Sequence, residues 1–84
     1  MKLEIDPNAL EDLKYWQKKD KSKLNKIYKL IEVIQDTPFE GEGKPEPLKY
    51  HLSKCWSRRI DRKNRLVYRV ESKSIIILQC RFHY

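Results

Sequence analysis

The end of the chain carries side chains that can move protons and hold an anion. Residues 81–84, RFHY, supply a guanidinium, an imidazole and a phenol. An apolar run at 75–78 precedes them and predicts a buried strand that ties this terminus into a sheet. Chain ends ordinarily fray, so an anchored end bearing His83 and Tyr84 indicates a functional site. The alternative is that His83 is an ordinary surface residue.

Arginine is confined to the second half of the chain. Residues 1–47 carry 9 basic and 10 acidic side chains, whereas residues 48–84 carry 10 and 2, within a net charge of +7. The arginines lie at positions 58, 59, 62, 65, 69 and 81. The planar guanidinium matches phosphate oxygens, so a polyanion is the expected partner. Nucleic acid is favoured over membrane because no amphipathic anchor accompanies these arginines.

These groups are those needed to cleave RNA without a metal ion. The neighbouring 2′-hydroxyl attacks phosphorus, a base takes its proton, an acid protonates the leaving 5′-oxygen, and cations stabilise the developing charge. His83 can serve as the acid or the base. The phosphate can be held by Arg59, Arg65 and Arg81. The carboxylate and a lysine beside it would come from Glu42 or Glu46 and from Lys44 or Lys49. On charge alone, RNA binding without cleavage is equally supported.

Two helices are expected in the first half. Positions 2–5 predict a short strand. Asp6 and Pro7 then supply an N-cap and a proline at the first position of a helix that ends near residue 19. A second helix starts at residue 20 or 22 and runs to about 35. The helix lysines are expected to form a solvated face, with a second nucleic-acid contact as the alternative: Lys14, Lys18, Lys21 and Lys29.

A three-strand antiparallel meander is expected after the glycine- and proline-rich segment 39–47, for which no regular element is expected. Even-numbered residues are assigned to the core face: Trp56, Ile60, Leu66, Tyr68, Val70, Ile76, Leu78, Cys80 and Phe82. A three-residue turn, 62–64, would join the first two strands, with Asn64 in the left-handed conformation. The predicted fold is α+β, with an N-terminal helix pair packed on a small antiparallel sheet.

The opposite, odd-numbered face gathers cationic side chains in this register: Arg59, Arg65, Arg69, Arg81 and His83. Like charges facing each other across strands are destabilising, so this face is predicted to bind an anion. Cys55 and Cys80 lack metal-ligand spacing and are expected to be reduced, with no metal or cofactor. The start has no signal-peptide pattern and no apolar run is long enough to span a membrane. One cytoplasmic domain, 1–84, is therefore expected.

Three segments, TPFEGEGKPEPLKYHLSKCWSRRI, NRLVYRV and CRFHY, resemble the YoeB toxins of the RelE/ParE superfamily, and the similarity spans the chain. This resemblance implies a RelE-like, microbial ribonuclease-like fold and a type II toxin that enters the ribosomal A site, cleaves mRNA and inhibits translation. It implies Glu46 as general base, His83 as general acid and Arg65 as the phosphate-stabilising residue. It also implies supporting roles for Lys49, Arg59 and Tyr84.

The resemblance further implies mRNA, ribosomal RNA and a YefM-like antitoxin as partners, with operator DNA reached only through the antitoxin. A homodimer is a further option, and no membrane is expected. The alternative is a noncatalytic relative that binds RNA or ribosomes and acts as antitoxin partner and corepressor. The ParE branch acts on gyrase, but it would not be expected to combine Glu46 and Arg65 with a terminal His-Tyr.

Overall fold

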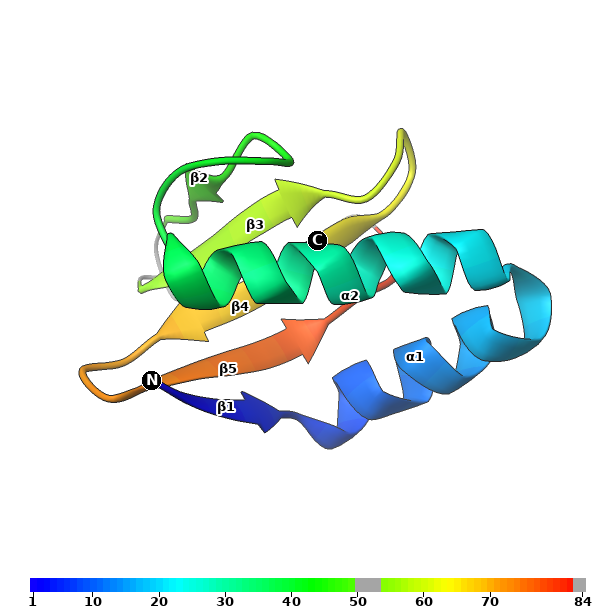
Figure 1. Cartoon of the computed structure of the whole chain (residues 1–84), viewed down its shortest axis with the longest axis horizontal. Helices are drawn as coiled ribbons and strands as arrows, with labels where there is room; N and C mark the ends of the chain where they lie inside the picture. Colours follow the sequence, from blue (N-terminus) through cyan, green and yellow to red (C-terminus); the bar gives the residue numbers. More distant parts are fainter. Residues whose placement is uncertain (50–53, 83–84) are drawn as a thin grey trace.

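Two helices pack on one face of a mixed sheet (Figure 1), in a computed structural model that describes residues 1–49 and 54–82. The elements are β1 (Lys2–Ile5), α1 (Pro7–Lys19), α2 (Lys21–Asp36), β2 (Glu46–Pro47), β3 (Cys55–Arg59), β4 (Arg65–Val70) and β5 (Ser74–Gln79). Within the described residues the strand order is β1-β5-β4-β3-β2. β1 runs parallel to β5 and the other pairs are antiparallel. The α+β prediction is confirmed, although the sheet is mixed.

Both helices begin at the predicted aspartates. The Asp6 carboxylate accepts a hydrogen bond from the backbone N–H of Asn8 at 2.9 Å, and Pro7 occupies the first helical position. Asp20 ends α1 and also caps α2, where its carboxylate accepts from the N–H groups of Ser22 and Lys23. These local caps satisfy backbone donors that have no partner inside a helix. The predicted helix limits are therefore confirmed to within one residue.

The core lies between the helices and the inner face of the sheet. α1 and α2 contribute a row of buried apolar residues: Ala9, Leu13, Trp16, Leu24, Ile27, Leu30, Ile31 and Ile34. The sheet contributes Ile60, Leu66, Tyr68, Ile75, Ile77 and Cys80. The indole N–H of Trp16 donates to the Cys80 carbonyl at 2.8 Å, which joins α1 to the end of β5. None of the helices in residues 1–49 and 54–82 is long and apolar enough to cross a membrane.

The predicted register of β5 was wrong along most of the strand. Ile75 and Ile77, and not Ile76 and Leu78, are completely buried on the helix side. A register shift places Val67 opposite Gln79 but Tyr68 opposite Ile77, so Leu78 is an extra residue in β5. Such a bulge reverses which side chains face inward. The even-numbered assignment therefore holds for Cys80 and fails before the bulge.

Phe82 was also assigned to the core, but its side chain is 60% exposed. The turn between β3 and β4 is organised by Asp61, which was not predicted. Its carboxylate accepts from the N–H groups of Lys63 and Asn64 at 2.8 and 2.7 Å. Asn64 does not take the left-handed conformation expected of it. Ile60 and Leu66 nevertheless share the core face, as predicted.

Candidate functional site

An acid–arginine pair lies on the sheet face opposite the helices. An Arg65 Nη on β4 is 3.3 Å from a Glu46 carboxylate oxygen on β2 and donates to the Ser57 hydroxyl on β3 at 2.8 Å. Ser57 and Arg65 alternate with Arg58 and Leu66, which face the core, so their side chains point to the other face. Three neighbouring strands therefore converge on one guanidinium.

The pair combines a sheltered cation with an accessible carboxylate. The Arg65 side chain is only 10% exposed, whereas that of Glu46 is 54% exposed. Ser57 is fully buried, and its hydroxyl accepts a hydrogen bond from the guanidinium. Ser57 is also the register partner of Glu46, so the two residues that contact the guanidinium lie side by side on neighbouring strands. A cation held rigidly at a protein surface can stabilise a negative charge placed against it without reorganising. The geometry suits a phosphate that approaches Arg65 beside the Glu46 carboxylate.

The end of the chain is fixed beside Arg65. The Arg65 N–H donates to the Phe82 carbonyl at 2.9 Å, and the Phe82 N–H donates to the Asn64 side-chain oxygen at 2.7 Å. Phe82 has a φ of 67°, a left-handed conformation that turns the chain at this point. These bonds place the residue preceding His83 next to the Glu46–Arg65 pair. His83 and Tyr84 themselves lie outside the described residues.

The segment leading to Glu46 is held by Arg58, the even-numbered arginine of β3, which was not among those predicted to hold the phosphate. Arg58 is completely buried, and its guanidinium donates to the backbone carbonyls of Thr37, Glu40 and Glu42. Its Nε donates to the hydroxyl of Tyr68 at 3.1 Å. The acceptor oxygens replace the water that a buried cation loses. Arg58 is therefore a structural residue and not part of an exposed anion-binding face.

Tyr68 and Gly43 complete this anchor. The Tyr68 hydroxyl donates to the Pro38 carbonyl at 2.6 Å, and burial, partly offset by Arg58, raises the pKa of Tyr68. Gly43 has a φ of 90°, and a Cβ there would lie 3.1 Å from the Arg58 Cβ. The Arg59 N–H donates to the Gly43 carbonyl at 2.7 Å. The segment that was expected to be irregular thus ends in an ordered strand, β2, whose Glu46 is placed by buried contacts.

Two further predicted residues, one on β3 and one after β2, are exposed. Arg59 is the register partner of Arg65 and is exposed. Lys49 follows β2 and is also exposed. Within the described part of the chain, neither has an acidic partner at ion-pair distance. Both are therefore available to an incoming anion, whereas Glu42 points elsewhere and lies 3.8 Å from Lys29.

Arg81 does not join the pair, because it lies beyond Gln79, the last residue of β5, where the alternation of a strand no longer fixes the direction of a side chain. Its guanidinium carbon lies 3.4 Å from the centroid of the Tyr15 ring on α1. Arg69, also expected on the anion-binding face, pairs with Glu71 at 3.0 Å. The structure thus brings together Glu46, Arg65 and Arg59, places Phe82 beside the Arg65 backbone, and separates Arg81 from the pair. Among the described residues, no cluster of His, Cys, Asp or Glu could hold a metal ion.

Comparison with known proteins identifies the class. Residues 5–84 match the family of YoeB-like toxins of bacterial type II toxin–antitoxin systems. Toxin YoeB of Escherichia coli K12 is 51% identical over 84 residues, which cover all of both chains. The chain belongs to this YoeB-like toxin family.

Solved structures agree with this assignment. A YoeB/ParE toxin from Agrobacterium tumefaciens superimposes with a TM-score of 0.96 at 44% identity and full coverage of both chains. YoeB of Staphylococcus aureus has been solved as a dimer and in a heterotetrameric complex with YefM. These match with TM-scores of 0.91 and 0.89 at 42% identity, covering 100% of this chain and 98% of theirs. The helix pair on a mixed sheet is therefore the architecture of this family.

Proposed function

We propose that this toxin is a ribosome-dependent endoribonuclease that cleaves mRNA in the A site and so inhibits translation. The observation that carries the proposal is the Glu46–Arg65 pair. The Arg65 side chain is nine-tenths buried, and its guanidinium pairs with the half-exposed carboxylate of Glu46 on the sheet face opposite the helices. A phosphodiester bound to Arg65 has a general base beside it. The chain end that carries His83 leaves from the residue hydrogen-bonded to the Arg65 backbone.

The mechanism is metal-independent attack by the 2′-hydroxyl. Glu46 takes the 2′-hydroxyl proton, the oxygen attacks the adjacent phosphorus, and His83 protonates the departing 5′-oxygen. Arg65 stabilises the charge that builds on the phosphate oxygens. Lys49, Arg59 and Tyr84 orient the strand and support the transition state. Arg81 is also predicted to bind the substrate. Because its guanidinium lies over the Tyr15 ring, its contact with RNA would be away from the scissile phosphate.

The ribosome supplies the alignment that this site lacks. The described part of the open face holds a phosphate mainly at one point, Arg65, whereas in-line attack requires the nucleotides on both sides to be fixed. Ribosomal RNA around the A site can hold the mRNA in that geometry. We therefore expect efficient cleavage on translating ribosomes and weak cleavage of naked RNA.

A YefM-like antitoxin and a second toxin copy are the proposed protein partners, since the S. aureus relative has been solved with YefM and as a dimer. The excess of arginine and lysine in residues 48–84 suits an acidic antitoxin segment that folds against it. The complex should weaken as salt rises. The proposed setting is the cytoplasm, where ribosomes lie, and operator DNA would be reached only through the antitoxin.

The decisive test is Arg65→Ala, assayed by primer extension on mRNA in a translating extract. Loss of one preorganised charge-stabilising donor typically lowers the rate about 100- to 1,000-fold. Arg62→Ala is the matched control, because Arg62 is exposed in the β3–β4 turn and makes no hydrogen bond or ion pair within the described residues. Thermal unfolding of both variants establishes that the fold persists. A folded Arg65→Ala protein that cleaves at the wild-type rate would refute the proposal.

A second arm separates cleavage from binding. A 2′-methoxy group at the cut position removes the nucleophile without removing the phosphate. Cleavage should stop while the message still binds. A protein that binds both messages and cleaves neither would instead be a noncatalytic partner of the antitoxin.

A further inference from the structure

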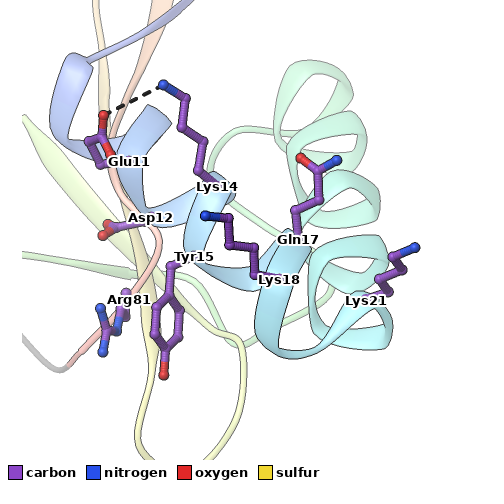
Figure 2. A pocket seen from close by; sticks show the side chains of 8 residues that line it. All are labelled: Glu11, Asp12, Lys14, Tyr15, Gln17, Lys18, Lys21 and Arg81. Carbon is purple, nitrogen blue, oxygen red and sulfur yellow. Dashed lines mark ion pairs between the residues drawn. The ribbon is translucent and has the colours of Figure 1, made fainter.

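A second cationic site lies on the helix side of the molecule, around the first helix (Figure 2). It is a pocket of about 810 Å³ between α1 and the end of β5. Its walls include Glu11, Asp12, Lys14, Tyr15 and Lys18 of α1, with Arg81 opposite. The proposed chemistry uses none of the α1 residues.

Two residues that line this pocket, Tyr15 and Arg81, form a stack with Phe82, which follows Arg81 in the chain. The Arg81 guanidinium carbon lies 3.4 Å from the Tyr15 ring centroid and 4.3 Å from that of Phe82. The Asp12 carboxylate accepts a hydrogen bond from the Cys80 N–H at 2.9 Å, and its negative charge attracts the Arg81 guanidinium. The guanidinium is thereby held in place. Because Phe82 is 60% exposed, a further planar group can be added to the stack.

Lysines rise beside this stack on one face of α1. Lys18 lies four residues after Lys14 and three after Tyr15, and Figure 2 shows the Lys14 side chain extending toward Glu11 and the Tyr15 ring extending the other way, beside Arg81. Lys14 lies 3.6 Å from Glu11, but both side chains are largely exposed, so this ion pair is weak. Lys18 has no acidic partner within the described residues. The pocket therefore offers ammonium groups next to an aromatic surface.

We propose that this pocket binds an unpaired mRNA nucleotide flanking the cleavage site. The base would stack on the Tyr15–Arg81–Phe82 group, and the adjoining phosphates would contact Lys14 and Lys18. Aromatic and guanidinium faces beside basic side chains are the means by which proteins hold single strands. Phe82 connects the two sites, because its backbone is hydrogen-bonded to Arg65 and Asn64. The proposal requires the RNA strand to pass Phe82 between the scissile phosphate and the pocket.

An acidic peptide fits the same pocket less well. Glu11 and Asp12 would repel its carboxylates, and a peptide without aromatic side chains would leave the stack uncovered. A nucleotide presents phosphate oxygens to the lysines and amino donors to the two carboxylates. The inference deepens the proposed function, since it takes the RNA substrate from it, but it concerns binding and not the chemical step.

The test measures binding without cleavage. The probe is a fluorescein-labelled single-stranded RNA of about twelve nucleotides with 2′-methoxy groups throughout, followed by fluorescence anisotropy at several salt concentrations. Tyr15→Leu keeps an apolar side chain but removes the ring, and should raise Kd roughly 5-fold or more, the usual effect of losing one stacked base. Lys18→Glu should reduce the slope of log K against log salt by about 0.7 or more.

Lys73→Glu is the matched control, because Lys73 lies in the exposed turn between β4 and β5, at the other end of the molecule (Figure 1). It changes the net charge equally and should weaken binding less than Lys18→Glu. An RNA hairpin of equal length, whose bases are paired, should show a smaller effect of Tyr15→Leu. Thermal unfolding identifies any variant that fails to fold. If Tyr15→Leu fails to fold, the comparison of Lys18→Glu with Lys73→Glu still tests the proposal.

Several results would overturn the assignment. Equal losses in Lys18→Glu and Lys73→Glu would show that only net charge matters. If folded Tyr15→Leu binds RNA with wild-type affinity, or if the wild-type protein does not bind RNA at all, the stack does not take part in RNA recognition. Tighter, Tyr15-dependent binding of a polyglutamate peptide would make the pocket a protein-docking surface. Because the probe cannot be cleaved, none of these results depends on whether Arg65 variants lose cleavage.

Discussion

Replacing Tyr68 by phenylalanine should weaken both the fold and the site, although Tyr68 does not contact Glu46. The hydroxyl donates to the Pro38 carbonyl at 2.6 Å and accepts from the Arg58 Nε at 3.1 Å. Its loss leaves a buried, charged donor and a partly buried carbonyl without this partner. Each such group costs about 1–3 kcal/mol, and the Arg58 guanidinium keeps its three carbonyl acceptors, so the expected loss of unfolding free energy lies in the lower part of the summed range, at about 2–4 kcal/mol.

That loss is large for this chain. A protein of this size is stable by on the order of 4–13 kcal/mol, and the melting temperature should fall by roughly 8–30 °C. Urea unfolding measures the free energy directly. Tyr28→Phe is the matched control, because the Tyr28 side chain is 49% exposed and its hydroxyl makes no hydrogen bond within the described residues. This control should lie within about 0.5 kcal/mol of wild type.

Cleavage should also fall at temperatures where Tyr68→Phe is still folded. Arg58 orders the carbonyls of residues 37–42, and a displacement of about 1 Å in the segment carrying a catalytic group can reduce a rate about 100-fold. Primer extension on translating extracts provides the assay. If Tyr68→Phe matches wild type in stability, the anchor does not contribute as argued. If it is destabilised but cleaves normally, the anchor does not position Glu46.

Three further outcomes are expected. Deletion of His83 and Tyr84 should change the melting temperature by only a few degrees, because the preceding residue makes the hydrogen bonds that fix the chain end, but cleavage should be lost. Burial alone would raise the pKa of Asp61, yet hydrogen bonds from Lys23 and the turn backbone hold it well below its ordinary value, so Asp61→Asn should cost roughly 1–2 kcal/mol at pH 7. That difference should shrink below about pH 4, where the carboxylate binds a proton in the unfolded chain while it stays charged in the folded protein, and a constant difference in acid urea titrations would contradict the assignment. Burial and Asp12 raise the pKa of Cys80 to about 12, so in a variant lacking the other cysteine it should react with a thiol reagent at pH 8 only as fast as the protein unfolds; faster labelling would show that the site opens locally.

The helices could be predicted because their signals are local. Asp6 and Asp20 each cap a helix within three residues, and the apolar spacing between them needs no tertiary information. The register of β5 could not be predicted in the same way. Every residue of the run 75–78 is apolar, so no alternation distinguishes the two faces, and the bulge at Leu78 has no sequence signature. Arg81 was misplaced for another reason, because the strand was expected to continue to the chain end, whereas β5 ends at Gln79.

The site was predictable to a different extent. Glu46 and Arg65 came from resemblance to a family, and their contact depends on β2, a two-residue strand in a segment rich in glycine and proline. Arg58 could have been recognised, because it lies between Trp56 and Ile60 on the predicted core face. Arginine is rarely buried, so its charge favoured an exposed position even though the alternation of the strand placed it on the core face. The carbonyls that bind it come from residues 16 to 21 positions earlier, a contact that no local pattern indicates.

The parallel pairing of β1 with β5 has a consequence for how the protein comes into being on a ribosome. Lys2–Ile5 is synthesised well before its partner strand, Ser74–Gln79, which lies about 70 residues later in the chain. Contacts of such wide sequence separation form late, because nearly the whole chain must exist before they can close. A nascent chain interrupted before β5 can form its two helices but cannot complete the sheet that carries the Phe82–Arg65 bond. The β1–β5 pairing and the Phe82–Arg65 bond therefore become possible only after β5 has been synthesised.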